Sequence, residues 1–206
     1  MKITGIKQQV RRAGRYSIFA DGKYTFSLSD SALLDSKLTV GQDLTQEEIE
    51  SLKQTSIDDK LYNNTLGYLA IRSRTTWEIT TYLQRKDASP TLIKTILNKL
   101  SNANLLDDNK FAIAFVNDRR LLRPTSRRKI IMELRKKHVP DEAIQAVVGT
   151  GSEQQEEEQT ALQAIIERKR RQTKYQDDLK LMQYLARQGF NYGDIKAALN
   201  NNAVDE

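Results

Sequence analysis

The sequence contains no cysteine, and this absence excludes several kinds of site at once. Without thiols the chain can form no disulfide, no thiolate metal centre and no covalent intermediate on cysteine. The lone histidine, His138, precedes Val139-Pro140 and is interpreted as a loop or helix-end residue rather than a catalyst or metal ligand. We therefore predict no metal site, and the composition suits a reducing cytoplasm.

Long apolar runs and phosphate-binding glycine loops are also missing. No stretch approaches the roughly 20 residues needed to span a bilayer, and no continuous apolar core follows the lysine of residues 1–7, as a signal peptide requires. The glycines are scattered and form neither a GxGxxG nor a GxxxxGK(S/T) pattern. Asp107-Asp108 is interpreted as a helix start rather than a metal site. We expect a cytoplasmic binding protein, not an enzyme, with no catalytic residues, cofactors or membrane contact.

One pattern occurs three times in the chain, over residues 79–97, 130–148 and 181–199. The interval between copies is 51 residues. The apolar anchors that keep this interval are Ile79, Ile130 and Leu181, then Leu83, Leu134 and Leu185, then Ile93, Ile144 and Ile195, then Leu97, Val148 and Leu199. A period near 50 residues indicates stacked repeats, in which each unit buries its apolar face partly against its neighbours.

The hydrophobic content of 38% is modest for 206 residues and favours several small cores over one large core. The predicted fold class is mainly α, with three tandem three-helix repeats in an elongated, curved stack and a small N-terminal α+β hairpin appendage. We place the appendage at residues 1–56 and the repeats at 57–105, 106–150 and 151–206.

Residues 1–30 show the period of two that is typical of strands. The alternating apolar residues are Tyr16, Ile18 and Ala20, then Tyr24, Phe26 and Leu28, with Asp21-Gly22 between them as a turn. A two-residue loop would pair Ala20 with Lys23 and place the two apolar rows on opposite faces. A three-residue loop pairs Ile18 with Phe26 and gathers one apolar face, so we prefer it. Residues 3–10 could supply a third strand.

Helix-start signals divide the rest of the chain. They are the capping boxes Thr45 with Glu48 and Thr75 with Glu78, then Ser89-Pro90, Asp107 or Asp108, Pro124-Thr125 and Pro140-Asp141. The first of these helices is expected to end near residue 54, and a new helical period begins at residue 57. Gly149-Thr150-Gly151-Ser152 predicts a hinge, and the acidic run 153–158 opens the last repeat. Residues 200–206 should fray.

The chain carries a net charge of +6, and its basic residues are concentrated in the second repeat. Between residues 119 and 137 nine bases stand against one acid, Glu133, which gives a local net charge of +8. The bases are Arg119, Arg120, Arg123, Arg127, Arg128, Lys129, Arg135, Lys136 and Lys137. Because Ile130, Ile131 and Leu134 are expected to face the core, the bases project outward. Such a patch attracts phosphate backbones or an acidic protein surface; the alternative is a solvated helix face.

A second basic cluster lies in the third repeat. Its members are Arg168, Lys169, Arg170, Arg171 and Lys174. Glutamates one to two helical turns earlier are expected to pair with part of this cluster. Three aromatic residues, Trp77, Tyr82 and Tyr184, are assigned to the core, with stacking on nucleic-acid bases as the alternative.

The order and spacing of these features resemble the RecX family of regulatory proteins. Residues 106–112 (LDDNKFA) open the second repeat and residues 188–199 (QGFNYGDIKAAL) close the third in the manner of that family. The resemblance spans residues 57–200, and the appendage resembles the N-terminal extension of longer Gram-positive members. One departure is Arg123-Pro124, which stands where the family often has Gly-Pro.

The resemblance implies a non-enzymatic modulator of the RecA recombinase. Such a protein binds in the groove of the RecA filament on DNA, blocks filament extension or promotes disassembly, and lowers strand exchange and coprotease activity in DNA repair and the SOS response. Carried over by position, Pro124 sets the turn, and residues 127–129 face the filament or its DNA. We expect a monomer whose partners are the RecA filament and single- or double-stranded DNA. The alternative is a stand-alone DNA-binding helical repeat protein, whose middle repeat acts as a helix-turn-helix reader.

Overall fold

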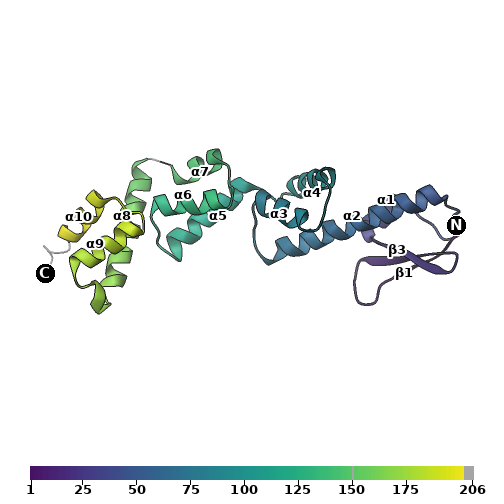
Figure 1. Ribbon diagram of the computed structural model, residues 1–206, viewed down its shortest axis with the longest axis horizontal. Coiled ribbons are helices and arrows are strands. Elements are labelled where there is room, and N and C mark those ends of the chain that lie inside the picture. Colours follow the sequence, from purple (N-terminus) through teal and green to yellow (C-terminus); the bar gives the residue numbers. More distant parts are fainter. Residues whose placement is uncertain (150, 202–206) are drawn as a thin grey trace. The chain divides into compact units, whose positions relative to one another are not determined.

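The computed structural model describes residues 1–149 and 151–201, and these form two compact units. Unit 1 consists of Met1–Arg72 with Tyr82–Lys99, and unit 2 of Ser73–Thr81 with Leu100–Glu206. The described residues form ten α-helices, one short 3₁₀-helix and three strands. The prediction of a mainly α chain with an N-terminal hairpin appendage is confirmed (Figure 1).

The strands of unit 1 form an antiparallel sheet in the order β1-β2-β3. They are β1 (Ile3–Gln8), β2 (Arg15–Ala20) and β3 (Lys23–Ser29). The preferred pairing of Ile18 with Phe26 is confirmed, yet Ala20 also pairs with Lys23 across a two-residue turn. A register shift after Ile18 reconciles the two pairings, because Phe19 pairs with Tyr24 and one residue of β3 is left over. The predicted three-residue loop is therefore wrong: the turn has two residues, Asp21 and Gly22, and the register shift restores the pairing of Ile18 with Phe26.

The apolar face of the sheet packs on the helices that follow it. Helix α1 (Asp30–Ser36) is capped by Ser29, and α2 (Gln46–Ile71) by the predicted capping box of Thr45. Ile18, Leu28 and Ile49 are almost completely buried in the shared core. The predicted helix end near residue 54 is wrong, because α2 is continuous for 26 residues. No proline or glycine occurs near residue 54, and the helix continues through its single glycine, Gly67.

A buried ion pair fixes α2 against the sheet. The Arg15 guanidinium lies 3.1 Å from the Asp59 carboxylate, and their side chains are 9% and 8% exposed. Arg15 also donates to the Ser27 hydroxyl at 2.9 Å, and Asp59 accepts from the Ser29 backbone N–H at 2.9 Å. Both charges are therefore compensated by hydrogen bonds as well as by each other.

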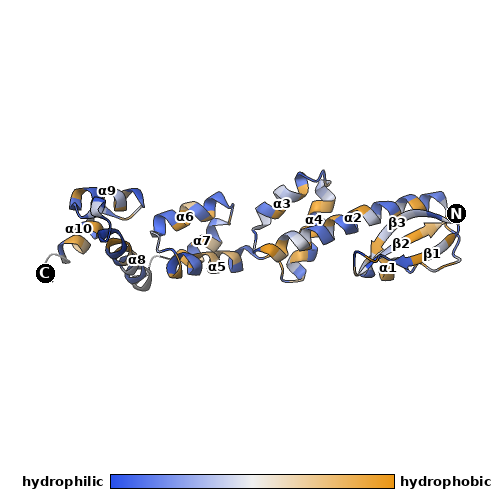
Figure 2. Cartoon of the chain, turned by 90° about the horizontal axis from the view of Figure 1, so that it is seen from below, coloured by the Kyte–Doolittle hydropathy of each residue, from blue (hydrophilic) through white to orange (hydrophobic). Residues whose placement is uncertain are grey.

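The remaining helices repeat with the predicted interval. They are α3 (Thr76–Gln84), α4 (Pro90–Asn102), α5 (Asp108–Leu121), α6 (Arg127–Lys136), α7 (Asp141–Val148), α8 (Ser152–Arg170), α9 (Asp178–Arg187) and α10 (Tyr192–Asn201), with a 3₁₀ turn at Thr173–Tyr175. The starts of α3, α6 and α9 are 51 residues apart, and so are those of α4, α7 and α10. Figure 2 shows hydrophobic and hydrophilic residues alternating along these helices.

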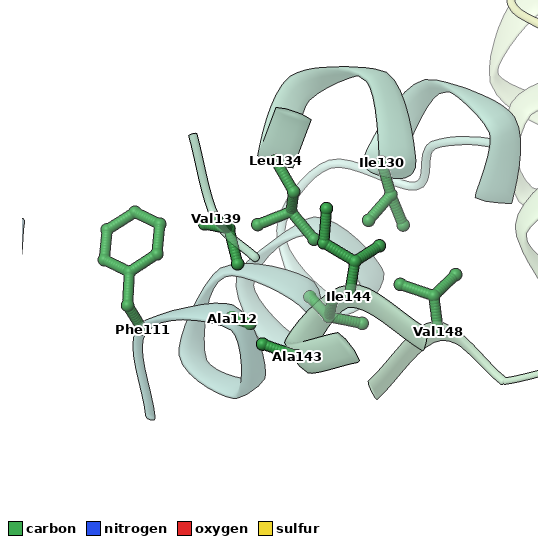
Figure 3. Packing of buried hydrophobic residues seen from close by; sticks show 9 residues of the cluster. Phe111, Ala112, Ile130, Leu134, Val139, Ala143, Ile144 and Val148 are labelled. Atoms are coloured by element: carbon green, nitrogen blue, oxygen red, sulfur yellow. The ribbon is translucent and has the colours of Figure 1, made fainter. Parts of the chain in front are cut away.

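The apolar anchors form the cores of the repeats. Leu83, Leu134 and Leu185 are each 0% exposed. In the second repeat, α6 and α7 bring Ile130, Leu134 and Ile144 together over Ala112 of α5 (Figure 3). The third repeat has an equivalent core from α8, α9 and α10. Each interval of 51 residues thus returns the chain to the same buried position.

Most of the predicted helix starts are confirmed. Asp107, rather than Asp108, caps α5 by accepting from two backbone N–H groups. Helix α6 begins later than Pro124-Thr125 predicted, because the Ser126 hydroxyl accepts from the Lys129 backbone N–H and makes Ser126 the N-cap. The predicted hinge at 149–152 includes Thr150, which lies outside the described residues, as does most of the segment expected to fray.

Candidate functional site: a basic groove in unit 2

Consecutive repeats in unit 2 are joined by the same hydrogen bond made twice. The Thr75 hydroxyl, which caps α3, donates to the backbone carbonyl of Lys137 at 2.9 Å. The Ser126 hydroxyl, which caps α6, donates to the backbone carbonyl of Gln188 at 2.5 Å. Both cap residues are 0% exposed. Each cap therefore closes its own helix and also holds the last turn of the next repeat's second helix.

Two further contacts recur at the same joints. The first backbone N–H of α3, from Thr76, donates to Asp108 at 2.8 Å, and that of α6, from Arg127, donates to Glu158 at 2.7 Å. Side chains then cross each joint in the same place: Lys137 meets Glu78 at 3.3 Å, and Lys129 donates to Gln188 at 2.7 Å. The third repeat carries Asp177 at the corresponding cap, and an ionised carboxylate cannot donate to a carbonyl.

A residue in the left-handed region follows the second helix of every repeat. These residues are Asp87, His138 and Gly189, with φ of 57°, 55° and 94°. Trp77 stacks on His138 with ring centroids 4.2 Å apart, so its assignment to the core is wrong: it is 42% exposed and covers a helix end. At the next joint Arg128 takes the place of Trp77, and a Cβ added to Gly189 would lie 3.5 Å from the Arg128 Cβ. That distance is an ordinary contact; the tight approach at this position is to the Ser126 hydroxyl oxygen, 2.8 Å from such a Cβ.

The outward face of α6 forms one side of a groove of about 1020 Å³. Ile130 and Leu134 point into the core, which leaves the intervening side chains to line the groove. The lining residues are Arg127, Arg128, Ile131, Met132, Arg135 and Lys136 from α6, with Gly151, Gln155, Glu158, Gly189, Asn191 and Asp194 from the third repeat. Four bases and two apolar side chains therefore face two carboxylates.

The structure divides the first predicted cluster into free and paired bases. Arg123, Arg128 and Lys136 are exposed, and within residues 1–149 and 151–201 they form no ion pair. The paired bases are Arg119 with Glu133 at 2.8 Å, Arg120 with Glu157, Arg135 with Asp141 at 2.9 Å and Lys137 with Glu78. Lys129 is half-buried at the joint to the third repeat, so the prediction that it projects into solvent is wrong.

The second predicted cluster does not line this groove. Arg170 bonds to the backbone carbonyl of Gln176 at 2.7 Å and to the Asp178 carboxylate, and the Lys169 ammonium lies 4.7 Å from the centre of the Tyr184 ring. For the described side chains, the expected pairing with the preceding glutamates is wrong, because the turn after α8 places Asp178 closer. Arg168, Arg171 and Lys174 are exposed.

The acids of the groove were not anticipated as part of a site. Burial raises the pKa of the Glu158 carboxyl above its usual 4.5; the Arg127 backbone N–H opposes this shift, and the nearby Asp194 carboxylate adds to it. In the sequence, Glu158 belongs to the acidic run 153–158, which predicts the start of a helix and not a binding site. Only the contact across the joint shows that it faces α6.

Tandem three-helix units, joined through their helix caps, define a helical-repeat protein. Four sequence families match the chain: "Regulatory protein RecX N-terminal domain" over residues 1–45, and "RecX, first three-helix domain", "RecX, second three-helix domain" and "RecX, third three-helix domain" over residues 62–100, 107–148 and 156–199. The chain belongs to the RecX family of regulatory proteins.

Relatives and solved structures agree with this assignment. The "Regulatory protein RecX" of Listeria monocytogenes is 32% identical over 96% of this chain and 74% of its own length. That of Lactobacillus johnsonii is 34% identical over 69% of this chain, but the match spans only about half of that relative, 52%. A crystal structure of regulatory protein RecX superposes with a TM-score of 0.73 at 27% identity, covering 97% of this chain and 98% of the other.

Two structural observations limit the kinds of site in the described residues. No helix there is long and apolar enough to cross a membrane. No group of three or more histidine, aspartate or glutamate side chains within residues 1–149 and 151–201 is placed to hold a metal ion.

Proposed function

We propose that this protein binds RecA and its filament on DNA, and inhibits the recombinase, ATPase and coprotease activities of RecA in DNA repair and recombination. Membership of the RecX family supports this function. The observation that carries it is the groove of unit 2, in which unpaired bases lie beside exposed apolar side chains. A nucleoprotein filament presents both phosphates and protein surface, so it matches both kinds of lining.

The bases of the groove supply the electrostatic part of binding. Arg128 and Lys136 are exposed and available to phosphates or carboxylates. The Arg127 side chain also lines the groove, and its Nε is buried without a hydrogen-bond partner among the described residues. A buried N–H without an acceptor is costly, which disfavours the present side-chain position of Arg127 over one that points into the groove.

The apolar lining favours a protein partner in addition to DNA. Met132 is 49% exposed and Ile131 is half-buried, although both belong to a helix whose opposite face is a packed core. Unbranched methionine adapts to irregular partner surfaces, and it is common in protein-binding grooves. Ile131 also packs against the core of the second repeat, so Met132 is the apolar side chain that phosphate recognition alone would not require.

The alternative function is stand-alone DNA binding. The observation that favours it is the helix-turn-helix of α5 and α6, in which exposed Arg123 lies in the turn and exposed Arg128 in the first turn of α6. A protein that acts only on DNA should bind naked DNA with a steep dependence on salt and should leave RecA unaffected.

A double variant, Arg128→Ala with Lys136→Ala, separates the two functions. We expect inhibition of the DNA-dependent ATPase of RecA to weaken by about tenfold or more, since two charge-assisted contacts are lost. The matched control is Arg85→Ala with Lys94→Ala, which removes two exposed charges outside the groove and should leave inhibition unchanged. Intact inhibition together with lost DNA binding would show that the groove is a DNA site only.

Three further features belong to the proposal. We infer four functional segments, residues 1–56, 57–105, 106–150 and 151–206, although α2 runs through the first of these boundaries. We also infer that the protein acts as a monomer in the cytoplasm; the absence of cysteine agrees with a reducing compartment. The cluster Arg168, Lys169, Arg170, Arg171 and Lys174 is proposed as a second contact with RecA or DNA.

A further inference from the structure

The first 29 residues form a second strongly basic segment, separate from residues 119–137. They contain six bases and one acid, Asp21, which gives a net charge of +5 against +6 for all 206 residues. Arg15 forms the buried ion pair with Asp59 and does not contribute to the surface charge. The other five bases, Lys2, Lys7, Arg11, Arg12 and Lys23, are exposed. These five side chains lie on the sheet and loops of unit 1, outside the helical repeats.

An aromatic pair stands on the face of the sheet that is turned away from the core. Side chains alternate along β2, so the burial of Ile18 in the core directs the neighbouring Phe19 to the other face. Phe19 meets Tyr24 edge to face, with ring centroids 6.2 Å apart and an interplanar angle of 79°. Tyr24 is 59% exposed. The Lys7 ammonium lies 5.5 Å from the centre of the Phe19 ring, so a cation adjoins the aromatic pair.

The turn that carries Tyr24 is fixed by hydrogen bonds. The Thr4 hydroxyl accepts from the Gly22 backbone N–H at 2.9 Å and donates to the Phe19 carbonyl at 3.3 Å. The Asp21 carboxylate accepts from the Lys2 backbone N–H at 2.8 Å. Asp21, the one acid among residues 1–29, is therefore hydrogen-bonded at the turn. The aromatic pair is therefore held in place before any partner arrives, which lowers the entropic cost of binding.

We propose that this face of the N-terminal sheet binds single-stranded nucleic acid. A nucleobase stacks on the Tyr24 ring, which Phe19 contacts edge to face. The phosphates of the strand then contact the exposed lysine and arginine side chains. Lys23 adjoins the aromatic end, and Arg11 and Arg12 occupy the loop at the opposite end of strands about 20 Å long. This site belongs to unit 1 and is distinct from the α6 groove of unit 2, so it goes beyond the function proposed above.

The chemistry favours a single strand over a duplex or a protein. Only unpaired bases offer a free ring face to an aromatic side chain, and basic grooves with interspersed aromatics are the usual platform for single strands. Beside the aromatic pair, β1 presents Gly5 and Lys7, so the rings are bordered by a position without a side chain and by a cation that can contact a phosphate. The net charge of +5 complements a polyanion.

The test measures how the full-length protein binds a fluorescent oligothymidylate and its duplex form over a range of salt concentrations. All variants are made in the Arg128→Ala, Lys136→Ala background, so that DNA contacts of the groove do not mask the result. Tyr24→Ala should weaken single-strand binding by about 5- to 100-fold, whereas Tyr24→Phe should bind normally. Tyr192→Ala, at a similarly exposed tyrosine of α10 (62%), is the matched control and should have no effect.

A charge variant completes the test. Lys7→Ala with Lys23→Ala should lower the slope of log affinity against log salt by about 1.4, at about 0.7 per lost phosphate contact. Arg85→Ala with Lys94→Ala should leave the slope unchanged. Normal single-strand binding by Tyr24→Ala overturns the proposal, and so does an equal loss for the duplex. If Tyr24→Ala in a chain with an otherwise unchanged groove loses RecA inhibition while oligonucleotide binding is unchanged, the face belongs to a protein partner and the proposal is also overturned.

Discussion

One hydroxyl group makes two of the hydrogen bonds at the joint between the second and third repeats, and Ser126→Ala tests its contribution. The Ser126 hydroxyl accepts from the Lys129 backbone N–H at 3.3 Å and donates to the Gln188 carbonyl at 2.5 Å. Loss of an N-cap costs about 1 kcal/mol. A carbonyl that loses its donor in a partly buried joint adds about 1 kcal/mol. We expect a total loss of about 2 kcal/mol, because alanine replaces neither bond.

Two measurements check this magnitude. The free energy of unfolding, taken from urea denaturation, should fall by about 2 kcal/mol, and the Lys129 amide should exchange with solvent about 30 times faster. The matched control is Thr125→Ala. Its hydroxyl donates to the nearby Arg123 carbonyl at 2.6 Å, a local bond within the turn, and its loss should cost less than about 0.5 kcal/mol. Equal stability of the Ser126→Ala and Thr125→Ala proteins would refute the reasoning.

A double-mutant cycle isolates the contact across the joint. A Cβ added at Gly189 would lie 2.8 Å from the Ser126 hydroxyl oxygen, and Gly189 has a φ of 94°. Gly189→Ala should therefore destabilise the protein both by backbone strain and by this clash. In the Ser126→Ala background the oxygen is absent, so the penalty of Gly189→Ala should be smaller by at least about 0.5 kcal/mol. Additive effects would mean that the two residues do not meet.

Two other predictions concern buried charges. Asp59→Ala should lower the free energy of unfolding by about 3–5 kcal/mol, because the Arg15 guanidinium stays buried without its partner; Asp58→Ala, whose carboxylate accepts from the Gln54 side chain, is the control and should cost under about 1 kcal/mol. Burial raises the pKa of Glu158, so the folded chain holds this proton more tightly than the unfolded chain. The stabilisation is complete below pH 4.5 and is lost as the pH rises through the folded pKa, so Glu158→Gln should flatten the dependence of unfolding free energy on pH across this range. An unchanged pH profile would contradict this assignment.

Local signals in the sequence were sufficient for the repeat. Apolar spacing and N-cap residues act within one or two helical turns, so the 51-residue interval anticipated the starts of α3, α6 and α9 and the burial of Leu83, Leu134 and Leu185. Because these signals are local, two helix boundaries were predicted wrongly: the end of α2 and the start of α6. Nothing near residue 54 ends α2, and the Ser126 hydroxyl outcompetes Pro124-Thr125 as the start of α6.

The candidate site was only half predictable, because half of it depends on contacts between repeats. The charge density of α6 is visible in the sequence, and Arg128 and Lys136 are exposed as it implied. Glu158 and Asp194 enter the groove from a different repeat, and no local pattern places them there. The partners of Arg120, Lys129 and Lys137 are also far away in the sequence, so their burial and pairing could not be predicted from local composition.

Crosslinking from the groove tests the central claim most directly. A photoreactive amino acid in place of Met132, which is 49% exposed in the groove, should form an adduct with RecA when RecA is assembled on single-stranded DNA. The matched position is Ile113 of α5, also 49% exposed but outside the groove, and it should give no adduct. Adducts from position 132 with DNA alone, or equal RecA adducts from both positions, would contradict a RecA-binding groove on α6.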